Sequence, residues 1–247
     1  MDQLLTMKGT PLRAILLLAA AVIGAALWSS PAAAEGTPPR FTQQAGYTAG
    51  GRDFRYAQAT ITVPAGRSAA SSPLAYAGLE GDGVAAVAGV APCGTRALPS
   101  PHCAPGGWTA FYAVAITTLL RGHVHYLPLH PVRPGQAVAV SVYLNAAGGA
   151  LHFSIAPAGE QPAYLASAAP GGPVYTSAIA ADDWTGGPAR TPAAAVLNRF
   201  TGGAFTTLSG VQGTFGGPWA LTATLAPACS PGPLTDGGTA FTVGRSQ

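Results

Sequence analysis

Carboxyl groups are the side chains of this sequence best suited to acid–base chemistry, and they are few. From residue 35 to the C-terminus, glutamate occurs only at Glu35, Glu80 and Glu160. Glu80 lies in a glycine-rich turn (GLEGDG), and Asp182 lies near the end of a strand-like run. Two carboxyls can divide the roles of general acid and general base where their strand ends meet. Glu80 and Asp182 therefore form one catalytic hypothesis, and the alternative is two solvated acids that cap loops.

The other constellations indicate no metal or cofactor site. His123 and His125 alternate on one predicted strand face, whereas His130 is an odd number of residues away and falls on the other face. This pattern is typical of a partly exposed histidine pair. The glycine pairs fall at turns rather than before a helix, and no GxSxG elbow is present, so neither a phosphate loop nor a hydrolase elbow is indicated. We expect no cofactor and no metal ion.

The three cysteines have neither a CxxC nor a zinc-ligand spacing. Cys93 and Cys103 flank a loop rich in Pro, Gly and Arg (CGTRALPSPHC), which a disulfide would staple, and Cys229 lies in a second loop (PACSPGP). The sequence allows three single pairings and does not choose among them. We favour Cys93–Cys103, which leaves Cys229 as a thiol.

The N-terminal 34 residues have the pattern of a secretory signal peptide. Lys8 and Arg13 precede a wholly apolar run of about 15 residues (14–28), and Ala32 and Ala34 give an A-x-A cleavage site. The run is shorter than the roughly 20 residues that a membrane span needs. We therefore expect a secreted protein that is cut after Ala34, begins at Glu35, is not held in a membrane and can form disulfides.

The composition limits the class of protein. Only 9% of the residues are charged and the net charge is +3, which argues against a coiled coil and against a nucleic-acid surface. Glycine and proline account for 33 and 23 of the 247 residues, and such frequent turn residues favour an all-β chain. We expect a core that contains more Ala, Val and Tyr than Leu.

From residue 41 onward, apolar residues mostly alternate with period two, the pattern of half-buried strands. Turn signals such as PAG, RPGQ and PGGP separate the runs, and NAAGG between two of them predicts a hairpin. The predicted fold is one antiparallel β-sandwich of jelly-roll type over residues 35–247, with 230–247 as a loosely attached tail. The predicted strands are 54–63, 74–80, 84–90, 109–116, 124–129, 136–144, 151–156, 174–181, 204–208, 219–225 and 239–243.

The order of these segments resembles that of a known family, the secreted glutamic peptidases or eqolisins. AGYTAGGRDFRYAQATITVP (45–64) is similar to the family's opening strands, and LAYAGLEGDGVAAVAGVA (74–91) resembles its W-x-G-I-D-G…Q-T-G-V block. AFYAVAITT (110–118), the turn and hairpin of 131–155, and TSAIAADD (176–183) follow in the family's order. The resemblance covers about residues 45–208 and implies a concanavalin A-like sandwich.

The resemblance also implies where a catalytic pair would lie. Glutamic peptidases cleave peptide bonds at acid pH with a Gln amide and a Glu that acts as general base and then as general acid. Carried over by position, the Gln falls at Val87, the Glu at Ser177 and a second Glu of that strand at Ala181. None of these positions has the needed group, and a register slip of one residue would turn a neighbouring side chain to the other face.

These observations predict a secreted, monomeric, eqolisin-like β-sandwich without its peptidase pair. It would bind an extracellular peptide or glycan through a remnant groove, for which the sequence offers several aromatic residues: Tyr47, Tyr56, Tyr76, Phe111 and Tyr112. The alternative is an acid-acting glutamic-type endopeptidase whose site is shifted or uses the substitute carboxylates named above. The two hypotheses differ in whether a Gln and a Glu side chain meet on one face of a sheet.

Overall fold

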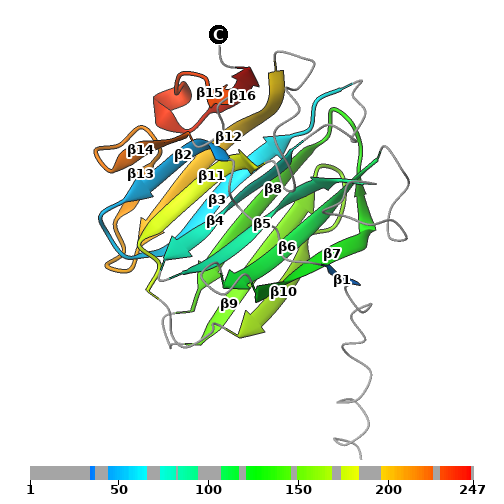
Figure 1. The fold of residues 1–247 in the computed structure, drawn as a ribbon, viewed down its shortest axis with the longest axis horizontal. Coiled ribbons are helices and arrows are strands. Elements are labelled where there is room, and N and C mark those ends of the chain that lie inside the picture. The colour runs from blue at the N-terminus through cyan, green and yellow to red at the C-terminus, as the bar shows by residue number, and fades with distance from the viewer. Residues whose placement is uncertain are drawn as a thin grey trace, which may run out of the picture. The chain divides into compact units, whose positions relative to one another are not determined.

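The strands of this protein pair into two antiparallel sheets, as a computed structural model shows. The structure describes residues 34–36, 44–65, 73–81, 83–93, 107–116, 121–145, 149–168, 174–183, 196–224 and 229–245. By their internal contacts Met1–Ala33 and Ala34–Gln247 separate into two units, and the two sheets belong to the second. The strands of both sheets run in nearly the same direction (Figure 1), as they do in aligned β-sandwiches.

Sheet A has eight strands, and it brings together the segments that the family resemblance singles out. Two strands that are neighbours in the sequence, β1 and β2, lie far apart in this sheet (Figure 1). In spatial order the strands are β1 (Ala34–Gly36), β7 (Arg121–Val132), β6 (Trp108–Ile116), β5 (Val84–Pro92), β4 (Leu74–Gly81), β11 (Ser177–Asp183), β2 (Gln44–Gly50) and β14 (Ala220–Thr224).

Sheet B forms the second layer. In spatial order its strands are β10 (Ala163–Ala168), β9 (Ala150–Pro157), β8 (Ala137–Leu144), β3 (Phe54–Thr62), β12 (Val196–Thr207), β16 (Phe241–Arg245) and β15 (Cys229–Pro231), and β13 (Gln212–Thr214) pairs with β12. Within the described ranges the helical content is one short 3-10 turn, η2 (Asp236–Gly238). No helix in the described part of the chain is long and apolar enough to cross a membrane.

The predicted all-β, antiparallel sandwich is confirmed, and the period-two pattern is what produces it. Along β8, for example, Val138, Val140 and Val142 are buried while the residues between them are more exposed. The predicted NAAGG hairpin joins β8 to β9, where the Asn145 amide donates to the Ala150 carbonyl at 2.9 Å. Turn residues interrupt every run before a helix can propagate.

The core between the sheets contains many Ala and Val side chains, as expected, but its large side chains are mostly Phe rather than Tyr. Phe200 and Phe241 stack with ring centroids 4.6 Å apart, and Phe54 meets Phe205 edge-on at 5.2 Å. Small residues let the two sheets approach, and the phenylalanines fill the remaining space. The buried phenylalanines are Phe54, Phe153, Phe200, Phe205, Phe215 and Phe241.

One residue of β3 lies on the other side from where alternation places it. Strict period two puts Phe54 on the opposite face from Ala57 and Ile61, but all three are buried in the same core. The register of β3 against β12 shifts between Thr206 and Thr207, where Phe54 pairs. A β-bulge of this kind inserts a residue and redirects the side chains beyond it.

The C-terminal segment is part of sheet B, so the expectation of a loose tail over 230–247 is corrected. β15 and β16 pair with each other, and β16 also pairs with β12. Phe241 and Val243 are buried alternate residues of β16, and the Tyr47 hydroxyl donates to the Gly232 carbonyl at 2.9 Å. The dense Gly and Pro residues mark tight turns here rather than a detached segment.

Candidate functional site

Sheet A has a second apolar face, on the side away from sheet B. Alternate residues of its strands, such as Ala75, Ala77 and Ala86, belong to the core between the sheets. The residues between them form a separate buried cluster, which we call the outer face: Leu74, Tyr76, Ala85, Val87, Ala91, Phe111, Ala113, Ile179 and Ala181. The outer face is therefore a continuous apolar surface built from β4, β5, β6 and β11.

The strand register brings all three positions of the implied catalytic group to the outer face. Val87 pairs with Gly78, which in turn pairs with Ile179. One row further along, Ser177 pairs with Glu80. Ala181 lies two residues beyond Ile179, opposite Tyr76. Two strand spacings, about 10 Å, separate the backbone of β5 from that of β11. A long side chain on each strand could therefore meet over β4.

The side chains at these positions carry no acid–base group. Val87 and Ala181 are fully buried. A Cβ atom added to Gly78 would lie 2.7 Å from Cγ1 of Val87 and 2.2 Å from the Ala86 carbonyl oxygen, so Val87 packs directly over a strand position that has no room for a side chain. Ser177 has a hydroxyl, whose proton affinity is too low for a general base without a partner. This part of the outer face can hold an apolar group but cannot activate water.

Polar contacts of β4 centre on Glu80 and Gln44. The Gln44 amide donates to the Tyr76 hydroxyl oxygen at 2.7 Å and to Oε1 of Glu80 at 3.4 Å. Burial raises the pKa of Glu80 to about 7, and the hydrogen bond from Gln44 acts in the opposite direction by favouring the charged carboxylate. Below that pH the carboxyl is mostly neutral and can donate as well as accept a hydrogen bond.

Gln44 is the site residue that the sequence reasoning missed. It lies at the start of β2, directly before the segment that carries the family resemblance, and it is buried with 7% of its surface exposed. A single glutamine at a strand start has no periodic or motif signal. Only the contact between positions 36 residues apart reveals it, so the one available clue was a Gln pair, Gln43 and Gln44, ahead of an aromatic strand.

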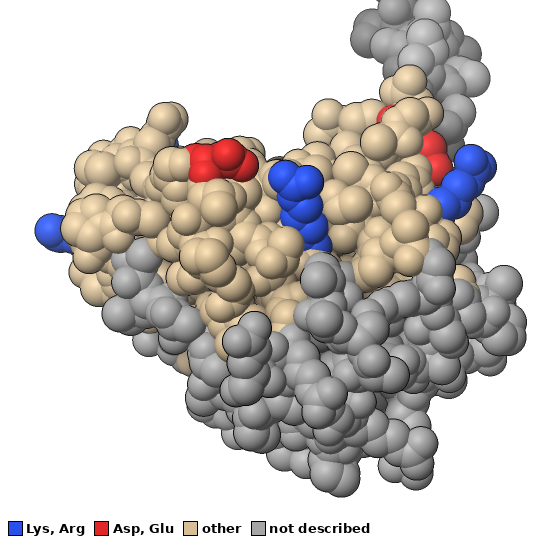
Figure 2. Space-filling model, turned by 90° about the horizontal axis from the view of Figure 1, so that it is seen from above, with Lys and Arg blue, Asp and Glu red and all other residues tan. Residues whose placement is uncertain are grey.

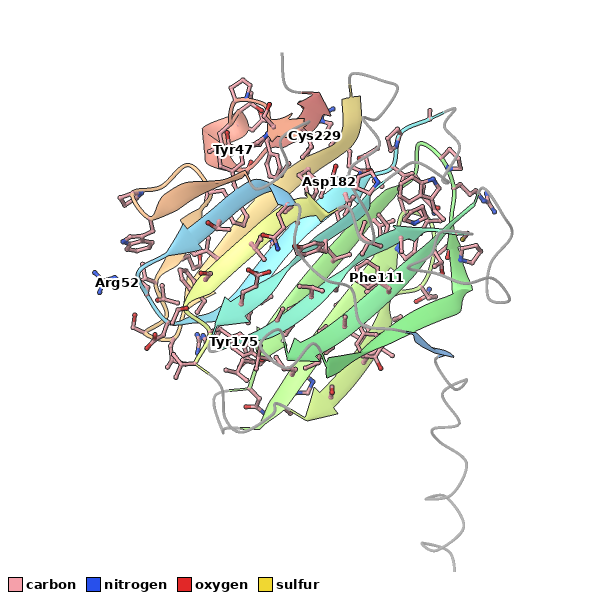
Figure 3. The ribbon with its side chains drawn as sticks, viewed as in Figure 1. Tyr47, Arg52, Phe111, Tyr175, Asp182 and Cys229 are labelled. Atoms are coloured by element: carbon pink, nitrogen blue, oxygen red, sulfur yellow. The ribbon has the colours of Figure 1, made fainter. Side chains whose placement is uncertain are left out.

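The structure does not bring Glu80 and Asp182 together. Asp182 pairs with Ala75, five residues from Glu80 along β4, a distance of about 17 Å. Alternation places Asp182 on the core side of β11, and it is buried there. The Asn198 amide of β12 donates to Oδ1 of Asp182 at 2.8 Å, which links the two sheets. Asp182, labelled in Figure 3, therefore serves the packing of the sandwich rather than the outer face.

The remaining predicted residues are dispersed. Cys93 is buried at the end of β5 and its amide donates to the Gly107 carbonyl at 2.8 Å, but Cys103 lies outside the described residues, so their pairing stays a prediction. Cys229 is a buried thiol. The side chains of the three histidines singled out above also lie outside the described part of the chain.

The five aromatic residues do not line one groove. Tyr76 and Phe111 belong to the outer face. Tyr112 is part of the core between the sheets and Tyr47 packs against that core, and burial raises the pKa of both hydroxyls. Tyr56 lies in β3 of sheet B, where its hydroxyl bonds Gln58. The aromatic part of the predicted groove is thus reduced to two rings, both fully buried.

A hollow elsewhere on the surface is open and contains no catalytic arrangement. It measures about 370 Å³ and is lined by Arg52, Asp53, Thr207, Leu208 and Ser209. Arg52 lies over the Trp219 ring at 5.8 Å and projects from the edge of the sandwich (Figure 3). Charged side chains are few and well separated on the face drawn in Figure 2. We therefore take the outer face, not this hollow, as the candidate site.

Comparisons with known proteins agree with this fold. No family model and no curated protein matches the sequence. Two solved structures of Scytalido-glutamic peptidase, one with a peptide-based transition-state analog and one with a transition-state analog inhibitor, are both 14% identical, with TM-scores of 0.54 and 0.59. SCP-B, a member of the eqolisin family solved with the tripeptide Ala-Ile-His, is 13% identical with a TM-score of 0.50. Each comparison covers 83% of this chain and 98% of the other, so the chain has the fold of the eqolisin peptidases.

Proposed function

We propose that this protein is an extracellular, non-catalytic β-sandwich that binds a peptide on the outer face of sheet A. The observation that carries the proposal is the register of β4, β5 and β11. It gathers the positions implied for a catalytic pair on one face and gives them Val87, Ser177 and Ala181. The export of the protein rests on the signal-peptide pattern of its first 34 residues.

The chemistry of the outer face suits a peptide better than a glycan. Sugar rings stack on exposed aromatic side chains, whereas Tyr76 and Phe111 are fully buried and the rest of the cluster is aliphatic. An apolar surface with a few hydrogen-bonding groups is typical of sites for small ligands and peptides. Gln44 and Glu80 supply such groups, an amide and a carboxyl that can bond a peptide backbone. Two of the similar structures hold peptide ligands, which supports the same choice.

The charge state of Glu80 argues against an acid-acting peptidase. A general base must be ionised, and a carboxyl with a pKa of about 7 is ionised in only about one molecule in a thousand at pH 4. Val87 and Ala181 supply neither a base nor an oxyanion donor. The substitute pair of Glu80 with Asp182 lacks the required proximity, since the two residues lie five positions apart and on opposite faces of the sheet.

The contact between Gln44 and Glu80 supports one alternative, a hydrolase that works near neutral pH. There Glu80 is substantially ionised, and a neighbouring amide is the kind of group that orients water. In this alternative Glu80→Gln abolishes hydrolysis. In the binding function that we propose, the same substitution leaves an amide that still hydrogen-bonds, and there is no hydrolysis to lose.

Peptide binding is testable by fluorescence anisotropy with residues 35–247 and a labelled pool of tryptic peptides from denatured casein. We expect saturable binding that Val87→Thr weakens about tenfold, because a hydroxyl replaces a methyl group at a fully buried position of the outer face. Val211→Thr makes the same change at a position that is 48% exposed, and it should bind like the wild type. Absence of saturable binding, or equal affinities for all three proteins, would contradict the proposal.

A further inference from the structure

The short connection between β1 and β2 has to cross most of sheet A. Gly36, the last residue of β1, pairs with Val124 of β7 near one edge of the sheet. Gln44 begins β2, which lies next to β14 near the other edge (Figure 1). Between these two strands stand β7, β6, β5, β4 and β11. Residues 37–43 (TPPRFTQ), which we call the crossing segment, are all that joins them.

The crossing segment is barely long enough for this path. Six strand spacings amount to about 29 Å, and an offset of four residues along β2 lengthens the straight line to about 32 Å on a flat sheet. Eight steps of extended chain, from Gly36 to Gln44, reach at most about 29 Å. The segment therefore has no length for a detour around either end of the strands. It can span only the shorter line across the concave side of a curved sheet.

Only one face of sheet A is free for such a line. The face towards sheet B is filled by the core in which Ala77, Ala86 and Ala180 pack against β3 and β8. The described strands that contact sheet A from another layer belong to sheet B, on that same side. On the outer face Val87, Phe111 and Ile179 nevertheless have no exposed surface. Some other part of the chain must cover them.

We propose that the crossing segment occupies the outer face as an internal ligand of the peptide site. Pro38 and Pro39 favour the extended backbone that the distance demands. Phe41 is the one large apolar side chain of the segment and stands five of the eight steps from Gly36 to Gln44, which puts it over β4 and next to Val87. The outer face is thus satisfied by a peptide of the protein's own chain.

This inference rests on the proposed function for its consequence, because it makes the internal peptide a competitor of any added one. A ligand that needs a site already occupied binds more weakly by the fraction of molecules in which the site is open. The crossing segment is tethered at both ends by β1 and β2, so its effective concentration at the outer face is high. Peptide affinity should therefore be limited by how readily Phe41 leaves the face.

Photo-crosslinking tests the occupancy directly. The chain 35–247 with p-benzoylphenylalanine in place of Phe41 is irradiated and digested, and crosslinked peptides are identified by mass spectrometry. We expect crosslinks to peptides from residues 74–91 or 177–183, the strands of the outer face. The same photoreactive residue in place of Tyr164, which is 73% exposed on β10, should not label those strands. Crosslinks from position 41 that miss both ranges, or no crosslinks, would overturn the inference.

A peptide-binding measurement separates this inference from the proposed function. Phe41→Gly removes the apolar contact while keeping the length of the segment, and we expect it to bind the casein peptide pool about tenfold more tightly than the wild type. Equal affinities for wild type and Phe41→Gly would overturn the internal-ligand inference while leaving peptide binding intact. Crosslinking to the outer face without peptide binding by either protein would uphold the occupancy and refute the proposed function.

Discussion

Glu80 is held between two opposing influences, and the balance decides its proton. Its surroundings remove the water that a carboxylate needs, while the Gln44 amide supplies one hydrogen bond. Burial dominates, so the pKa rises from its ordinary value to about 7. Glu80 is consequently a neutral hydrogen-bonding group in acid and a destabilising buried charge in base.

This balance predicts that folding stability depends on pH through Glu80. The unfolded chain releases the proton near pH 4.3 and the folded protein near pH 7, so the folded state binds more protons between these values. The contribution of Glu80 is complete below pH 4.3 and is lost as the pH rises to 7. Urea unfolding at pH 4.5, 6 and 8 should show a smaller fall in stability for Glu80→Gln than for the wild type. Glu160→Gln, in an exposed turn, should follow the wild type, and identical slopes for all three proteins would disprove the assignment.

Val87 and Ser177 predict a gain of activity. Long side chains at these positions would extend over β4 from either side on the same face. The double variant Val87→Gln/Ser177→Glu supplies both an amide and a base, and we expect it to cleave a fluorogenic peptide between pH 2 and 5. Val87→Gln/Ser177→Gln has a similar shape without the base and should stay silent. Activity of the control equal to that of the Glu variant would show that the cleavage has another source.

The secondary elements show what a period-two reading can and cannot predict. The runs with regular alternation, such as 54–63, 74–80 and 136–144, match strands β3, β4 and β8 closely. β10 (Ala163–Ala168) was missed, because it is short, alanine-rich and preceded by two turn residues with no contrast between faces. The positions of Val87 and Ser177 on one face followed from the family resemblance, but the partnership of Gln44 with Glu80 depends on tertiary contacts that no local pattern encodes.

At the C-terminus, β16 is predicted to be essential for stability. Phe241 stacks on Phe200 of β12 and meets Tyr47 of sheet A edge-on, so it joins the two sheets. Phe241→Ala should lower the free energy of unfolding by about 3–5 kcal/mol through the cavity it leaves. Thr242→Ala, an exposed neighbour on the same strand, should cost less than about 0.5 kcal/mol. Equal, small losses for both variants in denaturant titrations would mean that the C-terminal strands are loosely attached after all.

The loop between β5 and β6 predicts one accessible thiol per chain. Cys93 begins this loop, and its amide already bonds Gly107 at the loop's other end, so a bond to Cys103 would cross a closed loop. We expect alkylation of denatured, unreduced protein to modify Cys229 alone. Peptide mapping that finds three modified cysteines would exclude the disulfide, and modification of Cys93 or Cys103 would exclude this pairing.

At the scale of the whole molecule, the sandwich keeps the architecture of a peptidase fold while its outer face has changed in kind. The antiparallel fold follows from composition, turn residues and period-two alternation, all of which are local. The outer face follows from which strands are neighbours, which the sequence alone does not state. The central claim of this account is therefore a separation of binding from catalysis on a conserved type of scaffold.

The most direct test of that claim is to incubate purified protein 35–247 with denatured casein from pH 2 to 8 and to count new peptide termini by mass spectrometry. The account predicts no cleavage above that of buffer at any pH, because no position of the outer face combines an ionised base with an oxyanion donor. Cleavage that resists pepstatin and disappears in Glu80→Gln would contradict it and would identify Glu80 as a catalytic residue.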